Sequence, residues 1–147
     1  MSEARLGQLT GWVRRRPSSL EFWELFVTSD RLIWCFVGET FSSALLRADM
    51  GERARDELDS LTLDEIAAYN ERNFETPLDS LSSLRLVRGT RFRRTRLEIA
   101  WNGEERTLYS TKSSDPQQEL IETLADDPRL EGVSVETATP SSFFDRR

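Results

Sequence analysis

The feature that most restricts the fold is a pair of apolar segments, residues 20–29 (LEFWELFVTS) and 31–38 (RLIWCFVG). Both are rich in aromatic and β-branched residues and have the length of strands, and the polar step Thr28–Arg31 suits a short turn. In the second segment both alternating sets of side chains are apolar: Leu32, Trp34 and Phe36 on one face, Ile33, Cys35 and Val37 on the other. We therefore expect a hairpin whose second strand is covered on both sides.

The following residues can supply part of this cover. Between residues 41 and 61 apolar side chains recur at helical spacing, at Leu46, Met50, Ala54, Leu58 and Leu61. Thr62 and Glu65 then have the spacing of a capping box, which predicts a second short helix from about Leu63 to Asn70. We expect residues 41–73 to form a helical insertion after the first hairpin.

The second half of the chain returns to strands. Thr76 precedes a proline and is biased toward extended structure, and residues 84–88 have the composition of a strand. Leu97, Ile99 and Trp101 alternate with polar or small residues before Asn102-Gly103, the pair that a tight hairpin turn requires. Leu108 to Thr111 are expected to complete that hairpin.

A single helix is predicted near the C-terminus. Asp115 is the expected N-cap, Pro116 occupies the first helical position, and the buried side is formed by Leu120, Ile121 and Leu124. Residues 132–137 (GVSVET) predict a short edge strand, and residues 138–147 a flexible tail. The sequence thus predicts one α+β domain over residues 1–137.

The charged residues are unusual in kind. The formal net charge is −6, and of twenty basic residues Lys112 is the single lysine. This composition resembles that of proteins from halophilic archaea that accumulate salt, and the mutational bias of a GC-rich genome is the alternative explanation. Nucleic-acid binding through phosphate contacts weakens steeply as salt rises, so an acidic protein in such a cytoplasm is not expected to bind nucleic acid.

The absence of certain residues and motifs argues against several classes of function. There is no histidine and a single cysteine, Cys35, within an apolar segment, so we expect an inert buried thiol. Triads that need histidine and common zinc sites are excluded, and glycine-rich phosphate loops are missing. We therefore expect no enzymatic activity, metal or cofactor. No apolar run reaches the roughly 20 residues of a membrane span, and no secretory signal is recognisable, which favours a cytoplasmic location.

The order of the elements resembles the pleckstrin-homology (PH) superfold, in which a late helix closes one end of a bent antiparallel sheet or partly open barrel. Residues 25–34 (LFVTSDRLIW) are similar to the opening hairpin of GRAM-like and bacterial PH-like domains, and residues 76–89 (TPLDSLSSLRLVRG) to a later turn and strand. Residues 97–111 and 115–124 are similar to the closing hairpin and helix. The insertion 41–73 departs from this pattern, which also resembles uncharacterised proteins of halophilic archaea that imply no function.

The resemblance implies a non-catalytic binding or scaffold module. A protein or peptide partner at a sheet edge or groove is our first hypothesis. The alternative is anionic-lipid or phosphate binding, with association to the membrane, through an arginine-rich hairpin. Its candidate contacts are Arg91, Arg93, Arg94 and Arg96, together with Arg14, Arg15 and Arg16. Phe92 could enter a membrane interface and Trp12 could line a surface groove. A solvated charged face is the ordinary interpretation of such a run.

Overall fold

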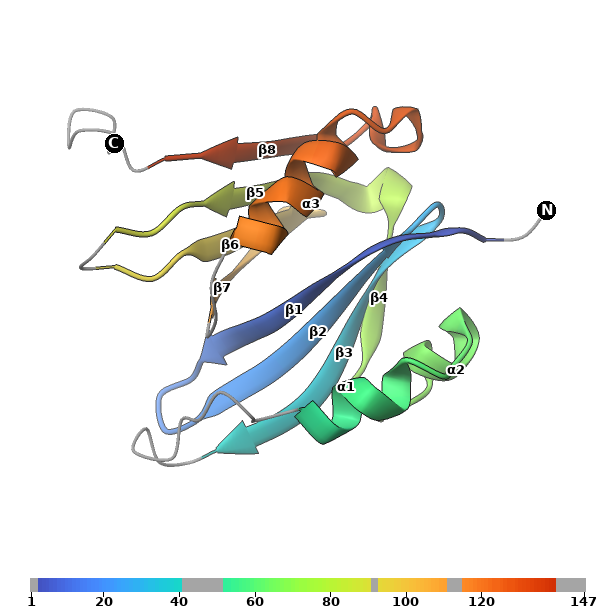
Figure 1. The fold of residues 1–147 in the computed structure, drawn as a ribbon, viewed down its shortest axis with the longest axis vertical. Helices are drawn as coiled ribbons and strands as arrows, with labels where there is room; N and C mark the ends of the chain where they lie inside the picture. The colour runs from blue at the N-terminus through green and yellow to red at the C-terminus, as the bar shows by residue number, and fades with distance from the viewer. Residues whose placement is uncertain (1–2, 41–51, 91–92, 111–114, 140–147) are drawn as a thin grey trace.

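The computed structural model describes residues 3–40, 52–90, 93–110 and 115–139. Within these ranges eight strands form one sheet in the order β4-β3-β2-β1-β7-β6-β5-β8, accompanied by three α-helices (Figure 1). The strands are β1 (Arg5–Arg15), β2 (Leu20–Thr28), β3 (Arg31–Thr40), β4 (Phe74–Pro77), β5 (Leu81–Val87), β6 (Arg96–Trp101), β7 (Glu104–Ser110) and β8 (Ser134–Ala138). The helices are α1 (Glu52–Leu58), α2 (Leu63–Ala67) and α3 (Asp115–Ala125), and single 3₁₀ turns occupy Leu78–Ser80 and Pro128–Leu130. The α+β class is confirmed.

The predicted opening hairpin is β2–β3, with Leu25 paired to Trp34. Its turn forms because the hydroxyl oxygen of Thr28 accepts hydrogen bonds from the backbone N–H groups of Asp30 and Arg31, at 3.0 and 2.9 Å. A threonine that satisfies the local backbone in this way stabilises a turn without help from distant residues. The turn prediction is confirmed.

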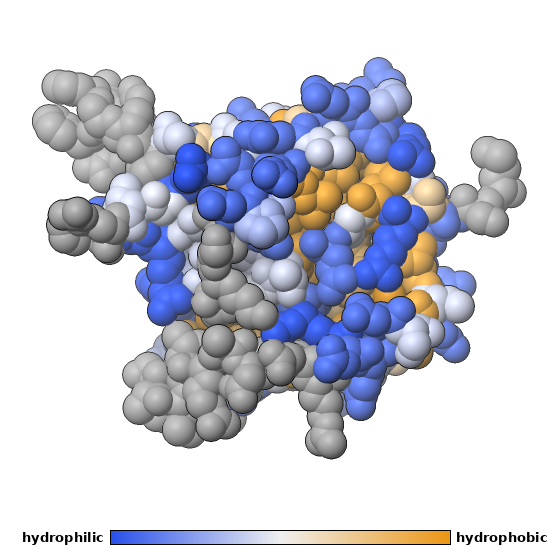
Figure 2. Space-filling view, in the orientation of Figure 1, coloured by the Kyte–Doolittle hydropathy of each residue, from blue (hydrophilic) through white to orange (hydrophobic). Residues whose placement is uncertain are grey.

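Both faces of β3 are buried, as expected. Leu32, Trp34 and Phe36 belong to the larger core, which lies inside the bent sheet and includes Ile121 and Leu124 of α3. The opposite face belongs to a second, smaller core of Phe26, Ile33, Cys35, Leu58 and Ile66, which α1 and α2 cover. The helices therefore cover different parts of the sheet, and hydrophobic residues are visible between α3 and the α1–α2 pair (Figure 2).

The helical insertion is partly described. Helix α1 ends at Leu58, which is fully buried, while Leu46 and Met50 lie outside the described residues. The capping box of Thr62 and Glu65 is confirmed, but α2 ends at Ala67 rather than near Asn70. The helix stops early because the side-chain amide of Asn73 donates to the backbone oxygen of Ile66 at 2.9 Å.

The second predicted hairpin is β6–β7. Asn102 and Gly103 have positive φ angles of 47° and 80°, as the tight turn requires. Strand β7 begins at Glu104 directly after this turn, earlier than the predicted Leu108.

The last strand, β8, pairs with β5 in parallel, which departs from the expected antiparallel sheet. The physical reason is that α3 and the turn after it return the chain to the end of the sheet where β5 begins (Figure 1). Strand β8 is an edge strand, as predicted. Of the predicted tail, residues 140–147 lie outside the described residues.

Strand β1 was not anticipated, and it corrects one expectation. It lies between β2 and β7, and Trp12 on this strand has no exposed surface, so the prediction that Trp12 lines a surface groove is wrong. Gln117 of α3 explains this burial, because its side-chain oxygen accepts hydrogen bonds from the indole N–H of Trp12 at 3.2 Å and from the backbone N–H of Thr10 at 2.9 Å. Trp12 therefore anchors α3 to the sheet.

Candidate functional site

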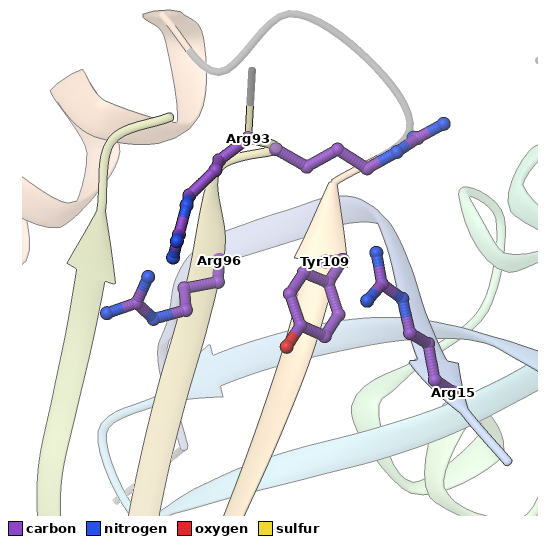
Figure 3. A pocket seen from close by; sticks show the side chains of 5 residues that line it. Arg15, Arg93, Arg96 and Tyr109 are labelled. Carbon is purple, nitrogen blue, oxygen red and sulfur yellow. The ribbon is translucent and has the colours of Figure 1, made fainter. Parts of the chain in front are cut away.

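Five side chains line one open pocket of about 600 Å³, which we call the arginine pocket: Arg15, Arg93, Arg94, Arg96 and Tyr109 (Figure 3). Three of them come from adjacent strands, since the order of the sheet here is β1-β7-β6. Tyr109 is paired with Arg96 on one side and with Val13 on the other, and Arg15 follows Val13 by two residues on the same face. The remaining two, Arg93 and Arg94, lie in the loop that leads into β6.

Arg15 and Arg93 supply the positive charge that is least neutralised. The Arg15 guanidinium lies over the ring of Tyr109, 4.0 Å from its centroid, a contact that orients the cation without neutralising it (Figure 3). Arg93 is exposed. Within the part of the chain that the structure describes, neither guanidinium forms an ion pair with a carboxylate.

Arg94 is held in place by the backbone. One of its terminal nitrogens donates to the backbone oxygen of Ser110 at 2.8 Å, and the backbone N–H of Ser110 in turn donates to the oxygen of Thr95. The loop before β6 is therefore fixed to the end of β7, and Arg94 is ordered before any ligand arrives.

The same loop depends on Gly89. Its backbone N–H donates to the hydroxyl of Thr95 at 2.8 Å, and a Cβ at this position would lie 2.3 Å from the backbone oxygen of Arg93. The backbone of residues 93–95 cannot move aside for this Cβ as the end of a flexible side chain could.

We predict that Gly89→Ala displaces the segment that carries Arg93 and Arg94. The expected result is a loss of about 1–3 kcal/mol in the free energy of unfolding, as for other overpacking substitutions, together with weaker anion binding. Chemical denaturation and an NMR titration with inorganic phosphate measure the two effects. Gly132→Ala is the control, because nothing lies within 4 Å of a Cβ there. Equal stability of the two variants would contradict the prediction.

Arg96 has an internal partner. Its Nε donates to Glu98 at 2.7 Å, and the second carboxylate oxygen of Glu98 accepts from Arg85 at 3.3 Å. Arg85 also pairs with Glu136 of β8 at 3.1 Å. Charges of alternating sign thus cross β8, β5 and β6 on the face of the sheet that carries the pocket.

The structure separates the arginines that the sequence grouped together. Arg93, Arg94, Arg96 and Arg15 line one pocket, whereas Arg14 and Arg16 do not. Arg14 and Arg16 lie 3.5 and 4.0 Å from the carboxylate of Glu21 and are not among the residues that line the pocket, so their contact with an anion stays a prediction. Successive side chains of a strand point to opposite faces, and this places Arg14 away from Arg15. Arg91 and Phe92 lie outside the described residues.

Tyr109 was missed from the sequence, although a signal for it was present. The turn at Asn102-Gly103 fixes the register of the hairpin, which pairs Trp101 with Glu104 and, counting outward, Arg96 with Tyr109. Extending the predicted turn by five pairs would have placed this aromatic ring beside the arginine-rich segment.

Cys35 and Arg106 have pKa values shifted by burial, and both lie away from the pocket. Burial raises the pKa of the Cys35 thiol to about 11, in agreement with the inert thiol that was predicted. Burial lowers the pKa of Arg106 to about 10, since its guanidinium lies among the rings of Trp23, Trp34 and Phe74, with centroids 5.1–5.8 Å away. Cys35 belongs to the smaller core, whereas Arg106 lies against aromatic rings of the larger core.

Comparison with known proteins gives a structural neighbour but no sequence family. No family model matches the chain, and no curated protein matches it. Among solved structures, the hSac2 domain from human phosphoinositide phosphatase Sac2 superposes with a TM-score of 0.53 at 13% sequence identity, covering 93% of this chain and 77% of that one. Within the described residues, no helix has the length and hydrophobicity to cross a bilayer. At this identity, the likeness to the hSac2 domain is one of fold alone.

Proposed function

We propose that the protein is a non-catalytic module of PH-like fold that binds a phosphorylated anion, such as a lipid head group, in the arginine pocket. The observation that carries the proposal is that four arginines line one open pocket. Planar guanidinium groups form paired hydrogen bonds with phosphate oxygens and keep their charge at any physiological pH. Among the described residues, Arg96 is the one pocket arginine that pairs with a carboxylate, that of Glu98, so the net charge of the pocket is positive.

The choice of a phosphorylated anion has two supports besides charge. The pocket volume of about 600 Å³ lies within the range of sites that hold small organic ligands, which is larger than one phosphate ion needs. The structural neighbour is a domain of an enzyme whose name refers to phosphoinositides. A phosphate group attached to a larger head group is the ligand that suits both observations.

The PH-like assignment is supported by the architecture. A bent sheet encloses the larger core, and α3 packs on β1, β5 and β8 near the C-terminus. The helices α1 and α2 between β3 and β4 form the insertion that departs from the PH-like pattern, and the parallel pairing of β8 with β5 is a second departure from it. The described pocket lining consists of arginines and a tyrosine, a set suited to holding an anion rather than to acid–base chemistry near neutral pH.

The test removes Arg15 and Arg93, which form no ion pair with a carboxylate among the described residues, and keeps Arg94, which the backbone of Ser110 holds. We expect the double variant Arg15→Gln/Arg93→Gln to lose at least about tenfold in affinity, since charge-assisted hydrogen bonds each contribute on the order of 1.5–3 kcal/mol. Binding is measured by flotation with phosphatidylcholine vesicles that contain phosphatidylinositol 4-phosphate, and by an NMR titration with inorganic phosphate. The first assay reports lipid binding and the second reports the phosphate chemistry that both ligands share.

The control is Arg5→Gln/Arg129→Gln, which changes the net charge equally at two exposed positions outside the pocket. Equal binding by the parent and the pocket variant would refute the proposal. Equal losses in both variants would show a general charge effect, which would refute a specific site as well.

A protein or peptide partner remains the second candidate. The observation in its favour is that β4 and β8 are the two edges of the sheet and each pairs on one side. Both edges are short, and Pro77 ends β4, so neither provides a long template for strand addition.

A further inference from the structure

We propose that Glu98 selects the ligands of the arginine pocket by charge, so that the pocket accepts phosphomonoesters, which are dianions, and rejects monoanionic phosphodiesters. This inference rests on the proposed function and concerns the same site. It starts from the observation that one of the four pocket arginines is already bound to a carboxylate of the protein itself.

The geometry shows how Arg96 is held. The Nε of Arg96 lies 2.7 Å from one oxygen of Glu98, and both side chains are partly shielded from solvent, with exposed fractions of 34% and 20%. In Figure 3 the guanidinium of Arg96 extends away from Tyr109 and Arg15. Arg96 therefore lines the pocket while its charge is directed to Glu98.

A ligand that uses Arg96 must compete with Glu98. If a monoanion replaced Glu98 as the partner of Arg96, one single charge would replace another, so the gain in binding free energy would be small. The nearby negative charge of Glu98 would also repel the monoanion. A dianion interacts about twice as strongly with each of Arg15, Arg93 and Arg94, because Coulomb energy is proportional to charge. Only the dianion gains enough from these three groups to draw Arg96 into the pocket.

The displaced carboxylate does not lose every partner. Arg85 lies 3.3 Å from the other oxygen of Glu98 and remains beside it when Arg96 turns away. Arg85 is itself held 3.1 Å from Glu136 on β8. The ion pairs on β5, β6 and β8 thus allow Arg96 to change partner without leaving Glu98 isolated, which keeps the exchange reversible.

The difference between the two ligand classes is chemical. A phosphomonoester has a second pKa of about 6 and carries about −1.5 to −2 charges at neutral pH. A phosphodiester has lost that ionisable oxygen and carries a single charge. The pocket should therefore recognise terminal phosphate groups and ignore the bridging phosphates of ordinary membrane lipids.

The test compares methyl phosphate with dimethyl phosphate by NMR titration near neutral pH. We expect the parent protein to bind the monoester at least about tenfold more tightly than the diester, a difference of about 1.4 kcal/mol. Glu98→Gln should bind the diester about tenfold more tightly than the parent does. The ratio of the diester Kd to the monoester Kd should therefore be smaller in this variant than in the parent. Glu105→Gln, an equal charge change at an exposed residue of β7, should leave the ratio unchanged.

A second readout does not depend on a variant. The Nε–Hε resonance of Arg96 in the parent should shift on addition of methyl phosphate, because its partner changes, and should stay in place with dimethyl phosphate. Vesicles containing phosphatidic acid, a monoester lipid, and phosphatidylglycerol, a diester lipid, show whether the selection also holds at a membrane surface.

The outcomes separate the two proposals. If the parent binds both esters equally, or if Glu98→Gln leaves the ratio unchanged, selection by Glu98 is wrong while the anion site stands. If the parent binds neither ester, phosphate nor vesicles, the proposed function itself fails.

Discussion

Replacing Glu24 with alanine is expected to lower the free energy of unfolding by about 3–5 kcal/mol, the usual cost of removing one member of a buried ion pair. Glu24 lies on β2 with no exposed surface. Its carboxylate accepts hydrogen bonds from the side-chain amide of Gln8 at 2.9 Å, from the backbone N–H of Gly11 at 3.0 Å and from Arg55 of α1 at 3.3 Å. Alanine removes the buried acceptor of three donors and leaves the Arg55 guanidinium without this carboxylate.

Urea unfolding followed by tryptophan fluorescence measures the loss. Glu24→Gln should lose roughly half as much, since an amide oxygen still accepts a hydrogen bond but the charge opposite Arg55 is gone. Glu105→Ala, at an exposed position, is the control. A Glu24→Ala protein as stable as this control would show that the carboxylate contributes nothing to the packing of α1 on the sheet.

Replacing Arg31 with methionine is expected to destabilise the protein by about 2 kcal/mol, most of it from one partner. The Arg31 side chain is 13% exposed, and its guanidinium donates twice to Glu3, at 2.8 and 3.0 Å. It also contacts Asp64 of α2 at 2.8 Å and Glu75 of β4 at 3.0 Å, but these carboxylates are 93% and 48% exposed, so their pairs contribute little. Methionine keeps the aliphatic contacts and removes the ion pairs.

The effect of Arg31→Met should depend on pH. The hydrogen bonds from Arg31 hold the pKa of Glu3 below its ordinary value in the folded protein. A carboxylate with a lowered pKa adds stability above its pKa in the unfolded chain, about 4.3, and this stability is lost as the pH falls through the folded value. The stability difference between parent and variant should therefore shrink in acid. A constant difference in urea unfolding between neutral pH and about pH 3 would contradict this account.

Local signals in the sequence were sufficient for several elements. The Thr62–Glu65 capping box, the Asn102-Gly103 turn and the apolar faces of β3 each depend on residues close together in the chain, and each is present in the structure. Strand β1 has no such signal, because its sequence mixes glycine, polar and apolar residues. It is a strand because β2 and β7 lie on either side of it, and that information is distant in sequence.

The sequence predicted that the candidate site would be rich in arginine, but it did not predict which arginines line the pocket. The arginine-rich segment that leads into β6 identified Arg93, Arg94 and the first residue of the strand, Arg96. The choice between Arg14 and Arg15 depended on which face of β1 each side chain occupies. That face is set by the bulge between Leu9 and Trp12, where the β1–β2 register shifts. A one-residue change in register would exchange the two arginines, and the sequence gives no means of locating the shift.

Strands β2 and β3 separate two cores of unequal size, and this arrangement implies which part of the molecule unfolds first. Among the described residues, α1 and α2 form the outer layer of the smaller core, whereas the bent sheet and α3 enclose the larger core. The α1–α2 layer can therefore detach at a free energy below that of global unfolding, while the arginine pocket and α3 stay in place. Transient exposure of hydrophobic surface, and with it sensitivity to proteases, should begin on the side of the sheet that these two helices cover.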